Sequence, residues 1–325
     1  MRWGWFLLAG AIFAPGGFAQ SKAPGIIVSA GYSPPTPLKV SPGQVITLFV
    51  HSPETQPLQA VSATSIPLPT SLNGYSVAME QTYTSAPIAV PLFSVYPLDN
   101  CIGLVPSVCS DLTAITIQVP WELVANRDRS GRPENFAVLK VTYQGTSGES
   151  FAVQPETDTI HVINSCDTTM PPGVQQAEDR AIPCSPLVTH IDGKLVTAAN
   201  PATAGETLTL YAFGLGSTGT AIKSGDASLV PVPLVDLVVN YQVGVNLQPT
   251  RPTSLAQRPS DAPAPIYAGL MPGQVGLYQV LVTIPRLPET TPFCTAASIA
   301  SNFTVSIGRT RSYDGAGICV QTGGQ

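Results

Sequence analysis

The sequence predicts an all-β protein built from two tandem β-sandwich domains that follow a signal peptide. Three observations lead to this fold class. The 325 residues include 33 Pro and 28 Gly, and only 11% are Asp, Glu, Lys or Arg. Short runs rich in Val, Ile and Thr alternate with Pro- and Gly-containing turns, a pattern typical of strands rather than helices. The same order of runs also occurs twice along the chain.

The first 19 residues are expected to be a secretory signal peptide rather than part of the fold. Arg2 supplies a positive charge, residues 3–13 form an apolar run, and residues 17–19 place small side chains at the −3 and −1 positions. This pattern is typical of cleavage after Ala19, which would make Gln20 the first mature residue. The alternative is an uncleaved membrane anchor, which the shortness of the apolar run disfavours. We therefore expect an exported chain without a membrane span.

The strongest strand pattern lies in residues 266–285, IYAGLMPGQVGLYQVLVTIP. A turn at 271–274 is followed by the apolar run 275–284, so a strand is predicted to start directly after the turn. A weaker copy occurs upstream, at 88–97 and 115–123. We interpret the two copies as evidence for two related β-domains.

Further segments recur in the same order at nearly constant spacing. Ser41 and Thr203 lie 162 residues apart, and Val119 and Ile284 lie 165 residues apart. The matched segments are 41–50 with 203–212, 72–81 with 238–247, 115–123 with 278–287, and 136–145 with 302–311. We therefore predict a duplicated domain of about 140 residues with roughly seven strands. The predicted boundaries are 20–163 for the first domain, 164–186 for a connector, and 187–325 for the second domain.

The cysteines indicate disulfide bonds, because their number is even and the chain is expected to be exported. They are Cys101, Cys109, Cys166, Cys184, Cys294 and Cys319. Sequence proximity favours the local pairs Cys101–Cys109, Cys166–Cys184 and Cys294–Cys319, and other connectivities stay open. A metal site is not expected, because there is no C-x-x-C pair and no His near any Cys.

Three motifs carry a resemblance to a known family. Residues 200–216 fit N-P-A-x-x-G-x-x-x-x-x-Y-x-x-G-L-G, residues 267–280 fit Y-A-G-L-x-P-G-x-V-G-L-Y-Q-V, and residues 118–122 read Q-V-P-W-E. In these motifs the chain resembles a family of uncharacterised secreted bacterial proteins, abundant in acidobacteria, that end in an immunoglobulin-like β-sandwich module. The resemblance covers about residues 100–325. It implies a β-sandwich and export, and it brings no catalytic residue or ligand. Together with the duplication, it leads us to expect two tandem immunoglobulin-like β-sandwich domains.

Residues 214–219, GLGSTG, form a literal G-x-G-x-x-G motif after an apolar run. A dinucleotide site needs a helix to begin at this point, so that its N-terminus faces the pyrophosphate. The following residues 220–228 show no helical periodicity, so the motif is predicted to be a glycine-rich turn. No cofactor is therefore expected.

The chain has three histidines, His51, His161 and His190, and none has another His, a Cys or paired carboxylates at a ligand spacing. Each is predicted to be a surface or strand-edge residue rather than a metal ligand. No G-x-S-x-G motif is present, although a triad assembled from distant residues stays open. We therefore expect no catalytic residues and no enzymatic activity.

Two other sets of residues have both a structural interpretation and an alternative interpretation as a binding site. Glu156, Asp158 and Asp226 lie on expected loops, where calcium binding is an alternative that no D-x-D-x-D-G loop supports. Five aromatic residues lie on expected strands, namely Tyr211, Phe213, Tyr267, Tyr278 and Trp121. Core packing is the interpretation we favour for these aromatics, and a carbohydrate-stacking face is the alternative.

These observations predict a non-catalytic secreted or cell-envelope protein with a structural, adhesion or protein-interaction role. The net charge of −5, without a basic stripe, argues against nucleic acid as a partner. The expected partners are other envelope or extracellular proteins, or glycans. A carbohydrate-binding module and a hydrolase with a dispersed site are the alternatives. The candidate interaction loops are 99–111, 125–135 and 217–229.

Overall fold

The computed structural model describes most of the residues between 26 and 321. The described ranges are 26–29, 38–51, 59–82, 84–97, 112–126, 134–163, 186–234, 239–244, 263–287, 289, 301–307 and 313–321. In these ranges the chain forms strands and turns and no helix, which confirms the all-β prediction. Consequently the described residues offer no helix with the length and hydropathy needed to cross a bilayer. The predicted signal peptide lies outside the described residues.

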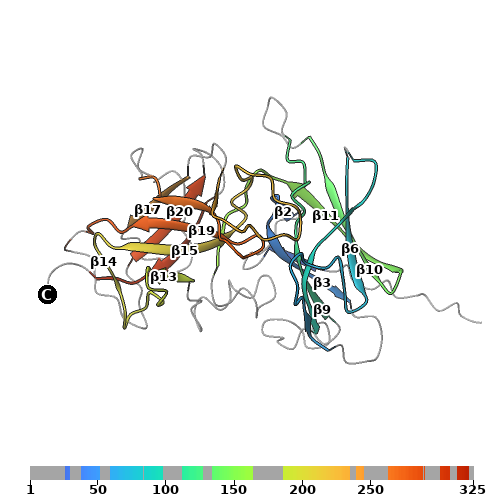
Figure 1. Cartoon of the computed structure of the whole chain (residues 1–325), viewed down its shortest axis with the longest axis horizontal. Coiled ribbons are helices and arrows are strands. Elements are labelled where there is room, and N and C mark those ends of the chain that lie inside the picture. The colour runs from blue at the N-terminus through green and yellow to red at the C-terminus, as the bar shows by residue number, and fades with distance from the viewer. Residues whose placement is uncertain are drawn as a thin grey trace, which may run out of the picture.

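The first half of the chain, residues 26–155, forms two sheets (Figure 1). One sheet has the order β1-β3-β9-β8-β4, with β1 Ile26–Ser29, β3 Val45–His51, β9 Leu112–Gln118, β8 Leu92–Pro97 and β4 Val61–Ser62. The other has the order β2-β11-β10-β6-β5, with β2 Leu38–Val40, β11 Thr146–Pro155, β10 Ala137–Tyr143, β6 Tyr75–Gln81 and β5 Ser71–Leu72. Strand β7 (Ile88–Ala89) also pairs with β6.

The second half, residues 161–321, repeats this arrangement. One sheet has the order β12-β15-β19-β18-β16, with β12 His161–Val162, β15 Thr207–Phe213, β19 Tyr278–Thr283, β18 Tyr267–Leu270 and β16 Val232–Pro233. Strand β13 (Val188–His190) also pairs with β15. Opposite lie β17-β20-β21, with β17 Val239–Gly244, β20 Ser301–Ile307 and β21 Tyr313–Ile318, and the pair β14-β22, with β14 Ala202–Thr203 and β22 Val320–Gln321.

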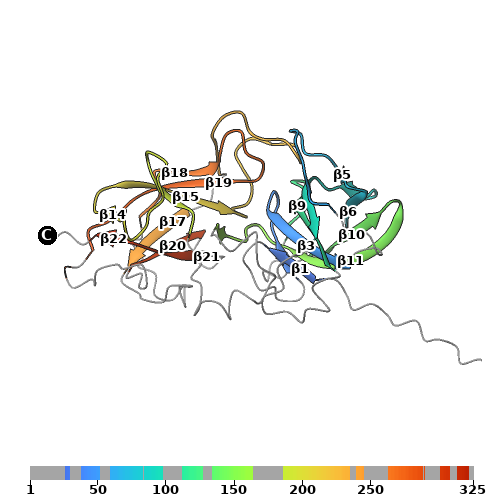
Figure 2. The same ribbon diagram turned by 90° about the horizontal axis from the view of Figure 1, so that it is seen from below.

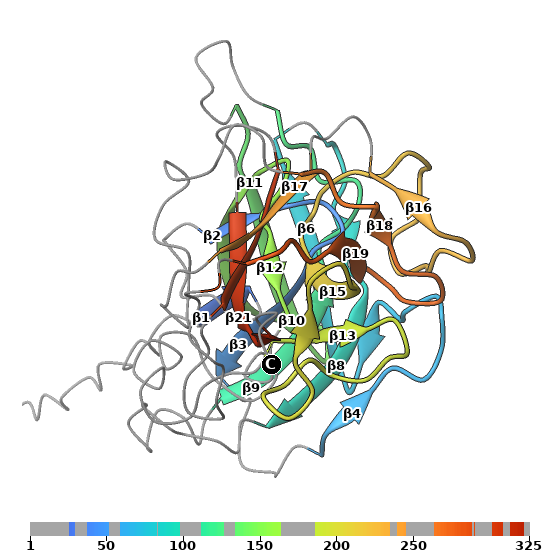
Figure 3. The ribbon, with the colours of Figure 1, turned by 90° about the vertical axis from the view of Figure 1, so that its left-hand side faces the viewer.

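Strands that match in sequence occupy the same place in their sheets. Strands β3 and β15 each lie beside the matched strands β9 and β19, and β8 and β18 follow on the far side. In the opposite sheets, β10 and β20 each pair with the matched strands β6 and β17. Even the parallel pairing of β2 with β11 has a counterpart in β14 with β22. Figure 2 shows the two halves following one another along the long axis, and Figure 3 looks along that axis from the side of the second half.

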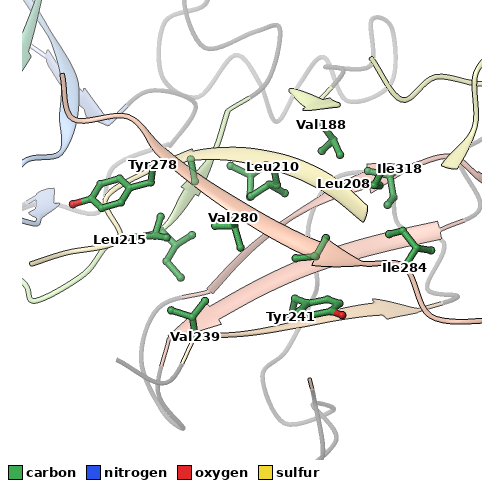
Figure 4. Packing of buried hydrophobic residues seen from close by; sticks show 14 of the residues in the cluster. Val188, Leu208, Leu210, Leu215, Val239, Tyr241, Tyr278, Val280, Ile284 and Ile318 are labelled. Atoms are coloured by element: carbon green, nitrogen blue, oxygen red, sulfur yellow. The ribbon is translucent and has the colours of Figure 1, made fainter. Parts of the chain in front are cut away.

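Each half has its own hydrophobic core between its facing sheets. Strand β6 shows how the sequence builds it: Tyr75, Val77 and Met79 alternate with half-buried residues and point inward, as the two-residue period of a strand requires. In the second half, Leu208, Leu210 and Val280 face Val239, Tyr241 and Ile318 (Figure 4). The Tyr241 hydroxyl donates a 2.7 Å hydrogen bond to the Thr283 carbonyl oxygen and so links the opposed sheets.

The strand predicted to start directly after the 271–274 turn begins later, at Tyr278. Gly276 has a φ of 66°, a left-handed conformation that a strand does not accommodate. The Met271 amide donates to the Leu277 carbonyl oxygen at 2.9 Å, which closes a wider loop than the sequence suggested. The apolar residue Val275 therefore belongs to this loop, where it is buried.

Candidate functional site

The junction between the two halves brings together residues from all three motifs singled out in the sequence. Strand β11 ends at Pro155 in the first half, and β12 begins at His161 in a sheet of the second half. Residues 156–160 therefore carry the chain across, and we call them the connecting segment. The Glu156 amide donates to the Val40 carbonyl oxygen at 2.8 Å, which holds the start of this segment against the first half.

The glycine motif at 214–219 packs directly against the connecting segment. The Thr159 amide donates a 2.7 Å hydrogen bond to the Gly214 carbonyl oxygen. A Cβ atom on Gly214 would lie 2.2 Å from the Thr159 carbonyl oxygen, and one on Gly216 would lie 2.3 Å from the Thr157 carbonyl oxygen. Both glycines also have positive φ angles, of 74° and 88°. The motif is thus a glycine-rich turn, as predicted, whose glycines permit a close backbone approach.

Thr159 also contacts the first half through its side chain. Its hydroxyl donates to Gln44 Oε1 at 2.6 Å and lies 2.9 Å from the Ser41 hydroxyl oxygen. The same Gln44 oxygen accepts the Ser41 amide at 2.9 Å. Ser41 and Gln44 are completely buried. This buried polar network ties the connecting segment to the turn that precedes β3, and buried polar groups that are satisfied in this way rigidify a structure.

A second set of hydrogen bonds joins the halves directly. Gln118, at the end of β9, accepts the Gly225 amide on Oε1 at 2.7 Å. The Leu68 amide donates to the Gly225 carbonyl oxygen at 2.9 Å. Gly225 has a φ of 88°, and a Cβ atom there would approach the Leu68 backbone to 3.3 Å. Both backbone groups of this one loop residue are therefore satisfied by the other half of the chain.

Trp121 and Glu122 complete the junction. Trp121 is half-buried and packs against the core of the second half. Its amide donates to Ser224 Oγ at 2.9 Å, and the Ser224 hydroxyl donates to Glu122 Oε2 at 2.6 Å. The Trp121 ring also covers Gly43, where a Cβ atom would lie 2.2 Å from a ring carbon. The Q-V-P-W-E motif at 118–122 thus supplies three side chains to one interface.

The motif at 267–280 contributes from the second half. A Cβ atom on Gly276 would lie 2.7 Å from the Gly43 carbonyl oxygen of the first half. The Tyr278 hydroxyl donates to the Gly216 carbonyl oxygen and so supports the glycine-rich turn from behind. Tyr278 is fully buried, and this burial raises the pKa of its hydroxyl far above the usual range.

Two of the three histidines form ion pairs with glutamates, which the sequence did not reveal. His51 Nδ1 lies 2.9 Å from Glu149 Oε1, and the His51 amide donates to the same oxygen at 2.9 Å. His190 Nδ1 pairs with Glu206 Oε1, and its Nε2 lies 3.2 Å from the Asn200 carbonyl oxygen. His51 and Glu149 lie on β3 and β11, which belong to different sheets of the first half, whereas the pairing of β13 with β15 brings His190 and Glu206 together.

The second pair shifts both of its pKa values. Desolvation alone would lower the pKa of His190, but hydrogen bonds to Glu206 and to the Asn200 carbonyl raise it above its ordinary value. Burial opposes the change at Glu206, yet hydrogen bonds from His190 and Thr203 hold the pKa of Glu206 below its ordinary value. Both ring nitrogens face acceptors, so the imidazolium form is favoured here.

The surroundings of the histidines bear on the alternatives of a catalytic or a metal site. Neither the His51 nor the His190 ring hydrogen-bonds to a Ser, Thr or Cys side chain within the described residues. His161 was expected to be a surface or strand-edge residue; it lies on β12 at the edge of its sheet and is buried, with an exposed fraction of 2%. The described part of the chain likewise holds no group of three His, Cys, Asp or Glu side chains suited to a metal ion.

The residues considered for the alternatives of calcium and glycan binding lie in the following surroundings. Glu156 and Asp158 are buried beside the junction, and Glu156 Oε1 lies 3.7 Å from Lys39 Nζ. Trp121 lies in a turn after β9 rather than on a strand, whereas the other four candidate aromatics lie on β15, β18 and β19. Among the aromatic side chains whose burial is described, Phe136 alone is exposed. This part of the surface therefore presents no row of aromatics.

The candidate loops and cysteines are only partly described. Loop 217–229 supplies Ser224 and Gly225 to the junction, whereas 99–111 and the middle of 125–135 lie outside the described residues. Of the six cysteines, Cys319 is described; it is buried and is not a free thiol. The other five lie outside the described residues, so the local pairing stays a prediction.

Sequence reasoning identified the junction motifs but not what they do. The three motifs were recognised as distinctive strings, and the glycine motif as a turn. Their meeting at one interface depends on contacts such as that of Gln118 with Gly225, which are 107 residues apart. One signal was present in the sequence, because the duplication predicts two units. The predicted connector at 164–186, however, lies beyond residues 156–160, which carry the chain from the sheets of one unit to those of the other.

Comparison with known proteins gives no family assignment. No protein-family model and no curated protein sequence matches the chain. Among solved structures, the Yersinia pseudotuberculosis adhesin InvE aligns at 11% identity and a TM-score of 0.19, over 88% of this chain and 57% of the adhesin chain. A structure of tandem Ig repeats of Dlar aligns at 8% identity and a TM-score of 0.17, over 92% and 98% of the two chains. Both scores are too low to support an argument about family or function.

Proposed function

We propose that this protein is a non-catalytic component of the cell envelope or extracellular space, in which two immunoglobulin-like sandwiches act as one rigid interaction module. The observation that carries the proposal is the junction. Both backbone groups of Gly225 bond to the first half, and Thr159 links Gln44 to Gly214. A tether between independent domains would need none of these contacts.

The rigidity suits a role in presentation or adhesion. Sandwich folds carry their variable residues on loops at the ends of the sheets, and a fixed relation between two units holds such loops at constant spacing. The surface of this protein that contacts the partner is then already ordered before binding, so less conformational entropy is lost on association. The expected partners are other envelope or extracellular proteins.

The histidine pairs support the non-catalytic part of the proposal. A general base must reach the proton that it abstracts, within hydrogen-bond distance or through one water. His190 instead directs one ring nitrogen to Glu206 and the other to the Asn200 carbonyl oxygen. The pair therefore works as a structural clamp between two turns.

Two experiments on the purified protein from Gln20 onward test the proposal. In a panel of ester, glycoside and peptide substrates, with and without calcium and zinc, we expect no turnover. Turnover that is lost on substituting His51, His161 or His190 would overturn the proposal in favour of a hydrolase. On a glycan array we expect no saturable binding, and saturable binding would favour a carbohydrate-binding module.

The positive test uses the junction itself. Proteins captured from an envelope fraction by the wild type should be lost with Trp121→Arg, which loosens the junction, and retained with Arg286→Trp, its counterpart in the second half. Capture that is indifferent to Trp121→Arg would show that the partner recognises one half alone and that the rigid junction is irrelevant to binding.

A further inference from the structure

The two halves present the same backbone turn at the corresponding end. We call residues 41–44 with 119–122 the first socket, and residues 203–206 with 284–287 the second socket. The Gly43 amide donates to the Val119 carbonyl oxygen at 3.0 Å, and the Gly205 amide donates to the Ile284 carbonyl oxygen at 2.7 Å. Both glycines have left-handed backbones, with φ of 74° and 82°.

The equivalence extends to the fourth residue of each turn. The Gln44 amide donates to the Ser41 carbonyl oxygen, and the Glu206 amide donates to the Thr203 carbonyl oxygen, each at 3.2 Å. In return, the side-chain oxygens of Gln44 and Glu206 accept the amides of Ser41 and Thr203, each at 2.9 Å. The sockets are therefore copies in their backbone and in their turn chemistry.

Their occupancy differs. The first socket receives the connecting segment, because Thr159 bonds to Gln44, and a loop of the second half, because a Cβ atom on Gly276 would lie 2.7 Å from the Gly43 carbonyl oxygen. At the second socket, a Cβ atom on Gly205 would have no heavy atom within 4 Å among the described residues. Arg286 occupies the position of Trp121, and its side chain is 79% exposed and reaches Glu289 at 3.3 Å.

The carboxamide of the first socket and the carboxylate of the second are also used differently. Gln44 Oε1 accepts the Thr159 hydroxyl of the connecting segment at 2.6 Å. In Glu206, Oε2 accepts the Thr203 amide, and the other carboxylate oxygen, Oε1, pairs with His190 from the same half. His190 thus takes the place at the second socket that Thr159 takes at the first. Likewise Gln118, which accepts the Gly225 amide, is matched by Thr283, whose side chain is shorter.

We propose that side chains at three matched positions decide which socket docks a neighbouring β-unit. The second socket has the same backbone turn as the first but lacks the side chains needed for docking. The first socket fits a unit of this same fold that presents glycine-containing loops such as 214–216 and 224–225. This inference does not depend on what the whole module binds. The deciding pairs are Trp121 and Arg286, Gln118 and Thr283, and Gln44 and Glu206.

Reciprocal substitutions in the full chain test the proposal. Trp121→Arg and Gln118→Thr each give the first socket a residue of the second, and Arg286→Trp and Thr283→Gln are the matched controls. The readout is hydrogen exchange of the Leu68 amide, which bonds to Gly225 but is not itself altered. We expect exchange about tenfold faster or more in the first two variants, as the loss of about 1.4 kcal/mol of docking implies. Both controls should match the wild type.

Small-angle scattering gives the second readout. We expect an increased radius of gyration for Trp121→Arg and an unchanged radius of gyration for Arg286→Trp. Should Trp121→Arg fail to fold, Gln118→Thr decides the question, since Thr is readily accommodated in a strand. The proposal would be overturned if the folded first-socket variants showed the hydrogen exchange of the Leu68 amide and the radius of gyration of the wild type.

A gain of docking is the stricter test. A combined variant carries Trp121→Arg together with Arg286→Trp, Thr283→Gln and Glu206→Gln. The first substitution releases the glycine-containing loops from the first socket, and the other three give the second socket the docking residues of the first. We expect the combined variant to self-associate head to tail in sedimentation velocity, whereas Trp121→Arg alone stays monomeric. A combined variant that remains folded and monomeric at every concentration would show that these positions do not decide docking.

Discussion

The backbones of Thr159 and Gly214 approach so closely that no side chain fits between them. The Thr159 carbonyl oxygen lies 2.2 Å from the position of a Cβ atom on Gly214, while the Thr159 amide donates to the Gly214 carbonyl oxygen at 2.7 Å. Thr159 belongs to the connecting segment and Gly214 to the glycine-rich turn. The hydrogen bond and the absence of a Cβ atom together hold the connecting segment close against the second half.

Gly214→Ala is therefore expected to destabilise the protein strongly. A methyl group would have to displace the Thr159 backbone and would also occupy a left-handed φ, so we expect a loss of about 3 kcal/mol or more in the free energy of unfolding. Gly205→Ala is the matched control, because its φ is similar and its surroundings are open. It should lose about 1 kcal/mol. Urea denaturation measures both, and equal losses would contradict the close approach.

Tyr278→Phe tests the support behind the glycine-rich turn. Removing the hydroxyl leaves the Gly216 carbonyl oxygen without its buried donor, which should lower stability by about 1–3 kcal/mol. Tyr267→Phe is the control, because the Tyr267 hydroxyl also donates to a carbonyl, at 3.1 Å, but its side chain is only partly buried. Its effect should be about 1 kcal/mol or less. If the two variants unfold at the same urea concentration, the Tyr278 bond contributes nothing special.

The His190–Glu206 pair makes stability depend on pH in a defined direction. The raised pKa of His190 contributes stability that is complete below the ordinary value of 6.5 and is lost as pH rises through the folded value. The lowered pKa of Glu206 contributes stability that is present above the ordinary value of 4.5 and is lost as pH falls through the folded value. The pair should therefore stabilise the fold most between these two values.

Thermal unfolding of the wild type and of His190→Gln across this range measures the effect. The difference in melting temperature should be largest between the two ordinary values and should shrink toward alkaline pH. Glu206→Gln should remove the same pH dependence, because it removes the partner of the imidazolium. A constant difference across the whole range would mean that His190 contributes through packing and not through charge.

The predicted disulfide between Cys294 and Cys319 can be tested by peptide mapping under non-reducing conditions. Cys319 directly precedes β22, whose Val320 pairs with Ala202 of β14. Closing this loop should stabilise the fold by about 3 kcal/mol in the chain-entropy model. Cys294→Ser should accordingly lower the urea midpoint. A peptide that links Cys319 to Cys101 would refute the local pairing.

The strands followed from the sequence because alternation is a local property. The run at 278–283 is buried on one face and its copy at 112–118 is buried at almost every position, and both segments were predicted as strands from their apolar and β-branched residues. The predicted start of the strand at 278–283 was wrong because Gly276 has a left-handed φ where it packs against Gly43. Local pattern carries no information about such a neighbour.

The candidate site was less accessible to sequence reasoning. Trp121 was taken for a strand aromatic, but it lies in a turn and covers a glycine of one half while it contacts the core of the other. The His190–Glu206 pair depends on the pairing of β13 with β15, which brings the ends of two strands together. Such relations are set by strand order, which the spacing of motifs alone does not define.

The position of Trp121 also gives the junction a built-in optical signal. The other two tryptophans, Trp3 and Trp5, lie in the predicted signal peptide, so a chain that begins at Gln20 contains a single indole. That indole lies between the Gly43 turn and the second core. Its emission should shift to longer wavelength when the halves separate, before either sandwich unfolds. The separation of the halves can thus be followed in dilute solution without attaching a label.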